Sequence, residues 1–154
     1  MSFKCKIIER DAQNTLSIRT SSSVQNLPQV LGKNWGAIMQ YLGQLNEQGS
    51  GPPFVAYYNM DMANLDIEIG IPVAKKIPTE HEIEAHEIPA GKYASCLYIG
   101  PYSDMKQAYE TLGKFIQDKG YERKQVKIAY ELYLNDPSEV APEELQTEIL
   151  FLLK

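Results

Sequence analysis

The segment LDIEIGI, residues 65–71, has a similar segment 80 positions later in LQTEILF, residues 145–151. In the first segment apolar residues alternate with polar ones or glycine, and this two-residue period is typical of a β-strand with one buried face. Glu68 of the first segment lies over Glu148 of the second. The pair therefore predicts two equivalent strands in an internally duplicated fold.

A second, shorter match supports the duplication. AYYN at residues 56–59 lies over AYEL at residues 129–132, at an offset of 73 positions. This alignment makes Tyr58 the counterpart of Glu131. It predicts that the two residues hold related places in the two halves.

Both halves show the same order of strand, helix and further strands. Helices are expected where apolar residues recur every three or four positions, and strands where they alternate or cluster between turn residues. The expected strands are residues 7–9, 15–20, 54–58, 65–71, 82–88, 92–99, 126–134 and 145–153, and the expected helices are residues 27–47 and 103–119. Gly49 and Gly120 are expected to end the helices, Ser103 or Asp104 to cap the second, and Gly91 to supply a positive φ in a turn.

The expected fold class is α+β, in a single domain over residues 1–154 with repeat halves of about 1–75 and 80–154. Two β-α-β-β units side by side form one antiparallel sheet with two main helices. A groove is expected at the pseudo-twofold seam, because such seams are favoured ligand sites.

Composition narrows the class of function. The chain has 15 Lys and Arg against 20 Asp and Glu, a net charge of -5, which argues against nucleic acid or an anionic membrane as the main partner. The N-terminal dozen residues carry charges and have no apolar run, so a cytoplasmic location is expected. Cys5 and Cys96 are expected as free thiols. His81 and His86, five apart on a strand, point to opposite faces, so neither a metal site nor a cofactor is expected.

One carboxylate interrupts an aromatic strand. In KIAYELYLNDP, residues 127–137, the apolar face consists of Ile128, Tyr130, Leu132 and Leu134, and Glu131 shares the other face with Ala129 and Tyr133. One interpretation is a sheet with a wet face, where Glu131 contacts water. The other is a carboxylate kept in a groove for a ligand.

The sequence resembles the GyrI-like family, the effector-binding domain of multidrug-sensing bacterial transcription regulators. The resemblance lies in EIPAGKYASCLYIGPY, residues 87–102, followed by YELYLNDP, residues 130–137, and LDIEIGIPV, residues 65–73, extends it to the first half. It implies duplicated β-α-β-β units and a groove for aromatic or amphiphilic cations. It also implies that a glutamate followed two residues later by tyrosine faces the ligand, and Glu131, which is followed by Tyr133, fills that position.

The resemblance also sets the expected partners and site. The family's regulators carry a helix-turn-helix or similar module, and no residues are left for one here, so a stand-alone domain without direct nucleic-acid contact is expected. Tyrosine rings add cation–π attraction of roughly 0.5–2 kcal/mol each when desolvated. The candidate ligand-binding residues are Glu131, Tyr133, Tyr58, Tyr57, Trp35 and Tyr98. Core packing is the favoured interpretation for Trp35, and the faces of Tyr57 and Tyr98 are left open.

Three functions follow in order of preference. The first is promiscuous binding of amphiphilic or aromatic cations, for sequestration or sensing, with no cofactor and no membrane. The second is a hydrolase of electrophilic small molecules, as in some relatives, with Glu131 as the base and Tyr133 or Tyr58 orienting water or the leaving group. The third is modulation of DNA gyrase, which the acidic balance supports only weakly.

Overall fold

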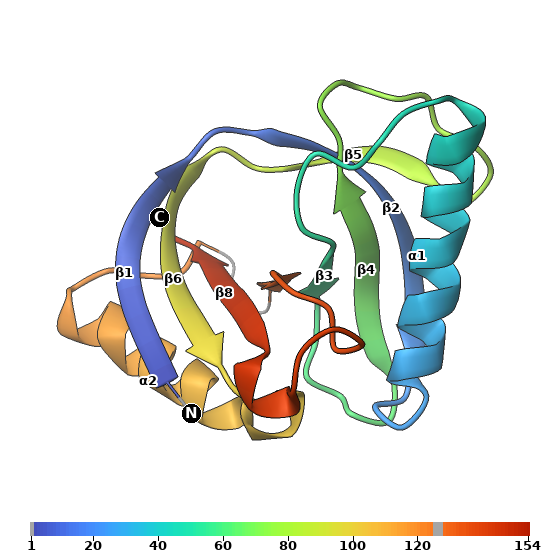
Figure 1. The fold of residues 1–154 in the computed structure, drawn as a ribbon. Coiled ribbons are helices and arrows are strands. Elements are labelled where there is room, and N and C mark those ends of the chain that lie inside the picture. Colours follow the sequence, from blue (N-terminus) through green and yellow to red (C-terminus); the bar gives the residue numbers. More distant parts are fainter. Residues whose placement is uncertain (1, 125–127) are drawn as a thin grey trace. The chain divides into compact units, whose positions relative to one another are not determined.

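The computed structural model describes residues 2–124 and 128–154, in two compact units (Figure 1). Unit 1 comprises Met1–Asp11 and Ala90–Lys154, and unit 2 comprises Ala12–Pro89. Val126 and Lys127, which the sequence assigns to a strand, lie outside the described residues. No helix within the described residues is long and apolar enough to cross a membrane.

Unit 2 is an antiparallel sheet with one helix. Its elements are β2 (Gln13–Ser22), α1 (Leu27–Gln44), β3 (Phe54–Tyr57), β4 (Leu65–Pro72) and β5 (Glu84–Ile88). The strands pair in the order β3-β4-β2-β5, and α1 packs along β2 and β4 (Figure 1). The buried core lies between helix and sheet and consists of Leu16, Ile18, Ile38, Tyr41, Leu42, Ile71, Val73, Ile77 and Ile83.

Unit 1 repeats this architecture. Its elements are β1 (Ser2–Arg10), β6 (Gly91–Ile99), the 3-10 turn η1 (Tyr102–Asp104), α2 (Lys106–Asp118), β7 (Ala129–Tyr133), the 3-10 turn η2 (Pro142–Glu144) and β8 (Gln146–Leu152). The strands pair antiparallel in the order β1-β6-β8-β7, and α2 packs on β6 and β1. The predicted α+β class and the duplication are therefore confirmed.

Strand register identifies the true counterparts in the two units. Ile69 of β4 faces Val55 of β3, and Ile149 of β8 faces Glu131 of β7. The equivalent hydrogen bonds Ser17–Glu68 and Ser95–Glu148 support the offset of 80 between β4 and β8, and that offset makes Val55 the counterpart of Glu131. The predicted match of Tyr58 with Glu131 is wrong. An error of three positions moves a side chain to the other face of a sheet, and a four-residue match does not fix register.

The helix ends differ in detail from the predicted ones. The helix predicted over 27–47 ends at Gln44, and Asn46, at φ 57°, takes the left-handed position expected of Gly49. The predicted cap of the second helix is also wrong. Residues 102–104 form the turn η1, and α2 begins after Met105 with no side-chain cap. Gly91, at φ 151°, confirms the predicted turn glycine.

The two helices end in the same way. After α2, the N–H of Gly120 donates to the carbonyl of Gln117 at 3.1 Å, and that of Tyr121 to Ile116 at 3.0 Å. These are the two hydrogen bonds of a Schellman motif, and they require a left-handed residue, here Gly120 at φ 78°. The equivalent bonds after α1 place Asn46 at that position.

A pair of glycine substitutions in unit 1 tests this helix end. Gly120→Ala forces an L-residue into the left-handed region, so we expect the free energy of unfolding to fall by about 1–2 kcal/mol. Gly113→Ala is the matched control, because Gly113 lies inside α2 with no atom within 4 Å of an added Cβ. It should raise the free energy of unfolding by roughly 0.5–1 kcal/mol. Denaturant unfolding measures both, and equal effects would contradict the assignment.

Candidate ligand-binding site

Strand β7 directs Glu131 toward the helix of unit 1. Alternate residues of a strand share a face, and Ala129 and Ile149, the neighbours of Glu131 on its face, belong to the core beneath α2. Glu131 is consequently only 8% exposed. The wet-face interpretation is therefore wrong, and the carboxylate lies in an apolar environment.

Two tyrosine hydroxyls hold this carboxylate. Tyr109, from α2, donates to Oε2, and Tyr133 donates to Oε1 at 2.8 Å. Burial raises the pKa of the Glu131 carboxyl above its ordinary value, while the hydrogen bonds from Tyr109 and Tyr133 act in the opposite direction. No ion pair within residues 2–124 and 128–154 involves Glu131. The site is a buried hydrogen-bond acceptor that has no counter-charge among the residues that the structure describes.

Aromatic rings extend from this carboxylate toward the surface. The rings of Tyr133 and Tyr102 pack edge to face, with centroids 5.7 Å apart and planes at 71°. Tyr133 is half-buried and Tyr102 is exposed. Burial, with the nearby carboxylates Asp136 and Glu131, raises the pKa of the Tyr102 hydroxyl, which keeps it protonated. The Tyr133 side chain thus lies between Glu131 and the exposed ring of Tyr102.

Tyr98, another candidate, lies in the core of unit 1. Its side chain is fully buried, and its hydroxyl donates to the carbonyl of Pro101 at 2.6 Å. Its ring stacks on Phe3, with centroids 5.7 Å apart. These contacts give Tyr98 a packing role, and ligand contact by this residue stays a prediction.

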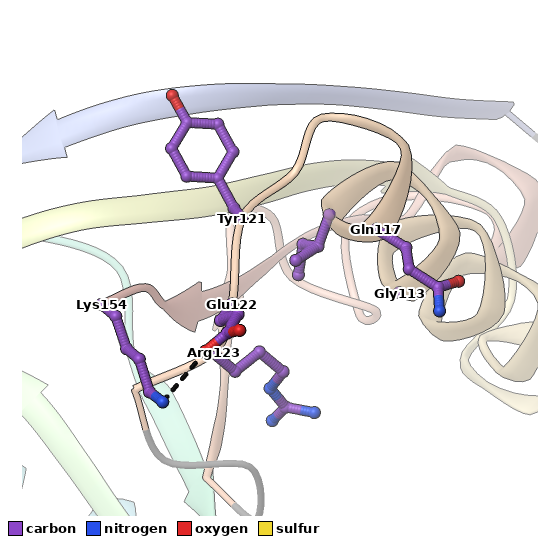
Figure 2. Close-up of a pocket in the computed structure, with 7 residues that line it drawn as sticks. Gly113, Gln117, Tyr121, Glu122, Arg123 and Lys154 are labelled. Carbon is purple, nitrogen blue, oxygen red and sulfur yellow. Dashed lines mark hydrogen bonds and ion pairs between the residues drawn. The ribbon is translucent and has the colours of Figure 1, made fainter.

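A surface cavity of about 470 Å³ opens near the C-terminal end of α2 (Figure 2). Gly113, Ile116, Gln117, Tyr121, Glu122, Arg123 and Lys154 line it. Glu131 is not one of these residues, so this cavity and the buried carboxylate are separate features of unit 1.

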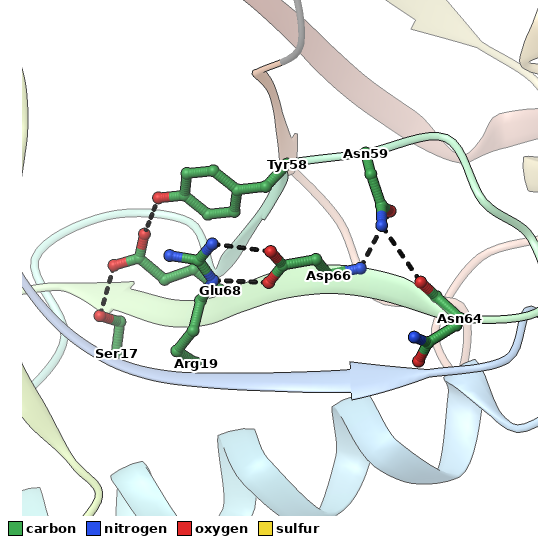
Figure 3. A network of polar contacts seen from close by, with 7 residues as sticks. All are labelled: Ser17, Arg19, Tyr58, Asn59, Asn64, Asp66 and Glu68. Atoms are coloured by element: carbon green, nitrogen blue, oxygen red, sulfur yellow. Dashed lines mark hydrogen bonds and ion pairs between the residues drawn. The ribbon is translucent and has the colours of Figure 1, made fainter.

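In unit 2, Tyr58 belongs to a different polar cluster (Figure 3). Its hydroxyl donates to Oε1 of Glu68 at 2.5 Å, and Ser17 donates to Oε2 at 2.5 Å. The Arg19 guanidinium lies 3.7 Å from the centroid of the Tyr58 ring and forms two hydrogen bonds to Asp66, at 2.6 and 2.8 Å. This guanidinium lowers the pKa of the Asp66 carboxyl. Tyr58 thus combines a carboxylate partner with a cation on its ring.

Unit 1 keeps only part of this cluster. Ser95 donates to Oε2 of Glu148 at 2.7 Å, which reproduces the Ser17 contact with Glu68. By register, Leu97 of β6 takes the place of Arg19. The serine and glutamate are therefore common to both units, and the arginine belongs to unit 2 alone.

The two remaining candidates lie in unit 2. Trp35 is half-buried against the core and donates Nε1–H to the carbonyl of Gly70 at 3.1 Å, which agrees with core packing. Tyr57 is half-buried at the end of β3, where register makes it the counterpart of Tyr133. A ligand role for either residue stays a prediction.

Sequence reasoning missed two residues of the site. These are Tyr109, which lies within the helix expected over residues 103–119, and Tyr102, which ends the segment of residues 87–102 that resembles the family. A signal for Tyr109 was present, because a tyrosine on an apolar helix face brings a hydroxyl that needs a buried partner.

The cysteines lie side by side in unit 1. Cys5 of β1 is directly opposite Cys96 of β6, and both are free thiols. Burial, followed by the neighbouring Cys5 thiol, raises the pKa of Cys96 to about 12, so Cys96 stays protonated. No group of three metal-ligating side chains occurs among the residues that the structure describes.

The chain belongs to the GyrI-like family, since the model of the GyrI-like small molecule binding domain matches residues 3–154. This confirms the resemblance drawn from the sequence. No curated protein sequence matches the chain.

Solved structures share the fold at low sequence identity. EcmrR, in a complex with DNA, is similar with a TM-score of 0.84 and 20% identity over 99% of this chain, which spans 57% of the EcmrR chain. A hydrolase from Listeria innocua has a TM-score of 0.71 and 14% identity, covering 98% of this chain and 92% of its own. SAV2435 bound to tetraphenylphosphonium has a TM-score of 0.62 and 13% identity, covering 98% and 94%.

The charge of Glu131 should make stability depend on pH in a defined direction. Glu131→Gln keeps the shape and removes the charge, so at pH 7 the variant should be as stable as wild type or up to about 2 kcal/mol more stable. The folded state holds the Glu131 proton more tightly than the unfolded chain does. Wild type therefore loses stability relative to the variant as pH rises from the ordinary glutamate pKa through the folded pKa. Denaturant unfolding from pH 4 to 8 measures this, and a pH-independent difference would contradict it.

Loss of a tyrosine hydroxyl should have the opposite effect and lower the free energy of unfolding. Tyr109→Phe leaves Oε2 of Glu131 without this donor, so the free energy of unfolding at pH 7 should fall by about 1.5–3 kcal/mol, and by less near pH 4. Tyr121→Phe is the control, because the Tyr121 hydroxyl makes no hydrogen bond within the described residues. Equal losses for the two variants would show that Tyr109 contributes only its ring.

Proposed function

We propose that this domain binds amphiphilic or aromatic cations at Glu131 of unit 1, for sensing or sequestration. The single observation that carries the proposal is a carboxylate that is 8% exposed, pairs with no cation among the described residues, and adjoins tyrosine rings. A ligand cation supplies the missing counter-charge. A stand-alone role and a cytoplasmic location remain predictions from the sequence.

Electrostatics favours a cation over a neutral ligand of the same shape. The free protein bears the cost of desolvating Glu131, which its raised pKa reflects. A bound cation offsets that cost, since opposite charges attract more strongly where water is excluded. Large cations with delocalised charge suit the site best, because they lose little hydration energy on entering an apolar environment.

The tyrosine rings supply shape tolerance. The rings of Tyr102 and Tyr133 lie close to Glu131. The face of each ring would contribute about 0.5–2 kcal/mol to the binding free energy of a desolvated cation. Flat rings accept many ligand outlines, so the site is promiscuous. SAV2435, which shares the fold, is bound to tetraphenylphosphonium, a cation of this type.

Two ions of equal shape and opposite charge test the proposal. Tetraphenylphosphonium should bind with micromolar affinity, and tetraphenylborate at least tenfold more weakly, a difference of about 1.4 kcal/mol or more. Isothermal titration calorimetry measures both. Equal affinities would remove the electrostatic basis of the proposal.

Substitution of the carboxylate identifies the residue responsible. Glu131→Gln should weaken tetraphenylphosphonium binding by roughly 1–3 kcal/mol, the range for a lost charge-assisted contact. Wild-type affinity should also fall as pH drops through the raised pKa of Glu131. The matched control is Glu110→Gln, which removes an exposed carboxylate from α2. Unchanged affinity in Glu131→Gln would show that the cation binds elsewhere.

A hydrolase is the second candidate, and one observation favours it. Glu131 has a raised pKa and accepts hydrogen bonds from two tyrosine hydroxyls, which gives a carboxylate base beside hydroxyls able to orient water or a leaving group. Glu131 and Tyr133 would then be the catalytic residues. Turnover of strained electrophiles such as epoxides, abolished in Glu131→Gln with the fold intact, would support this function. No turnover by wild type across such a panel leaves binding as the function.

A further inference from the structure

The cavity near the C-terminal end of α2 contains a cation with unused hydrogen-bonding capacity (Figure 2). Arg123 is half-buried, and its Nη2 donates to the carbonyl of Ile128 at 2.9 Å. Its Nε is buried and has no hydrogen-bond partner within residues 2–124 and 128–154. A guanidinium carries five N–H donors. Most of this capacity is therefore unmet by the part of the chain that the structure describes.

The guanidinium is held in place by an aromatic ring. It lies 3.6 Å from the centroid of Phe151 in β8, a distance typical of cation–π packing. Together with the bond to Ile128, this contact limits the rotation of the side chain. A group oriented in this way loses less conformational entropy when it binds a ligand.

The backbone around Arg123 is also tied down. The Schellman motif at Gly120 turns the chain out of α2, and the next residues pair with the end of β8. The N–H of Lys124 donates to Leu152 at 2.7 Å, and that of Lys154 to Glu122 at 2.9 Å. The cavity therefore has walls fixed by hydrogen bonds.

The charges that line the cavity leave the guanidinium without an anion. Lys154 and Glu122 form an exposed ion pair at 3.0 Å. No ion pair within the described residues includes Arg123. Burial lowers the pKa of the Arg123 guanidinium, as expected of a cation that has lost water and gained no counter-ion. An anionic ligand would relieve this cost.

We propose that this cavity binds a small organic carboxylate with an apolar body. A carboxylate accepts two parallel N–H bonds from a guanidinium, a geometry that a spherical anion does not match. Ile116 gives the cavity an apolar wall, and Gln117 adds an amide donor. The volume of about 470 Å³ is within the range of roughly 300–1,000 Å³ found for small-molecule sites.

Benzoate and benzamide test the proposal on the wild-type protein. They share shape and ring, and only benzoate carries the charge. Amide chemical shifts of residues 116–124, followed by nuclear magnetic resonance during titration, report binding. We expect saturable shifts with benzoate and at least tenfold weaker binding of benzamide. Equal binding of the two would overturn the proposal. So would inorganic phosphate binding as tightly as benzoate, because the site would then be a general anion site.

Variants assign the binding to Arg123. Arg123→Met keeps a long side chain on Phe151 and removes the charge, so benzoate affinity should fall at least tenfold. Arg123→Lys keeps the charge without the planar donors and should recover only part of the affinity. Lys106→Gln removes an exposed charge at the other end of α2 and should have no effect. Unchanged affinity in Arg123→Met, or an equal loss in Lys106→Gln, would overturn the assignment.

Discussion

Burial of one sheet face beneath a single helix is the constraint on which each unit depends. Side chains alternate along a strand, so register decides which residues meet the helix and which meet the opposite side. In unit 2 this rule places Val55 on the face that α1 covers, and in unit 1 it places Glu131 at the equivalent position under α2. An apolar position in one copy is thus occupied by a carboxylate in the other. Tyr109 and Tyr133 compensate for that exchange, because they provide the donors that an apolar core lacks.

The duplication allows the two copies to specialise. Both retain a serine hydrogen-bonded to a glutamate, Ser17 with Glu68 and Ser95 with Glu148, so this pair reflects the shared architecture. Unit 2 also contains Arg19, which pairs with Asp66 and lies over the ring of Tyr58, the tyrosine bonded to Glu68. Among the residues that the structure describes, unit 1 instead has a buried carboxylate, Glu131, and a half-buried guanidinium, Arg123, neither of which forms an ion pair. Under the two proposals, ligands supply the counter-charges of Glu131 and Arg123, which both belong to unit 1.

Much of the fold could be predicted from the sequence, because long periodic segments report directly on burial. The strands around Ile67 and Ile149 and the two helices lie close to their expected places. The register that relates β3 to β7 could not be predicted from AYYN and AYEL, because a match of so few residues can arise by chance and the connecting loops differ in length. The capping of α2 also escaped prediction, because Ser103 and Asp104 are suitable caps but are used in a 3-10 turn. At the site, Glu131 could be found as a charge among aromatic residues. Tyr109 could not be assigned to it without knowing how α2 lies on the sheet.

The order of the strands along the chain has a consequence for synthesis on the ribosome. Unit 2 is one continuous segment, Ala12–Pro89, whereas unit 1 joins Met1–Asp11 to Ala90–Lys154. Strand β1 precedes unit 2 along the chain, so it has no β6 partner until all of unit 2 has been made. During that interval the strands β2, β3, β4 and β5 can pair with one another, and β1 remains an unpaired strand. Lys4 and Lys6, two residues apart in β1, place positive charge along this strand until it pairs with β6.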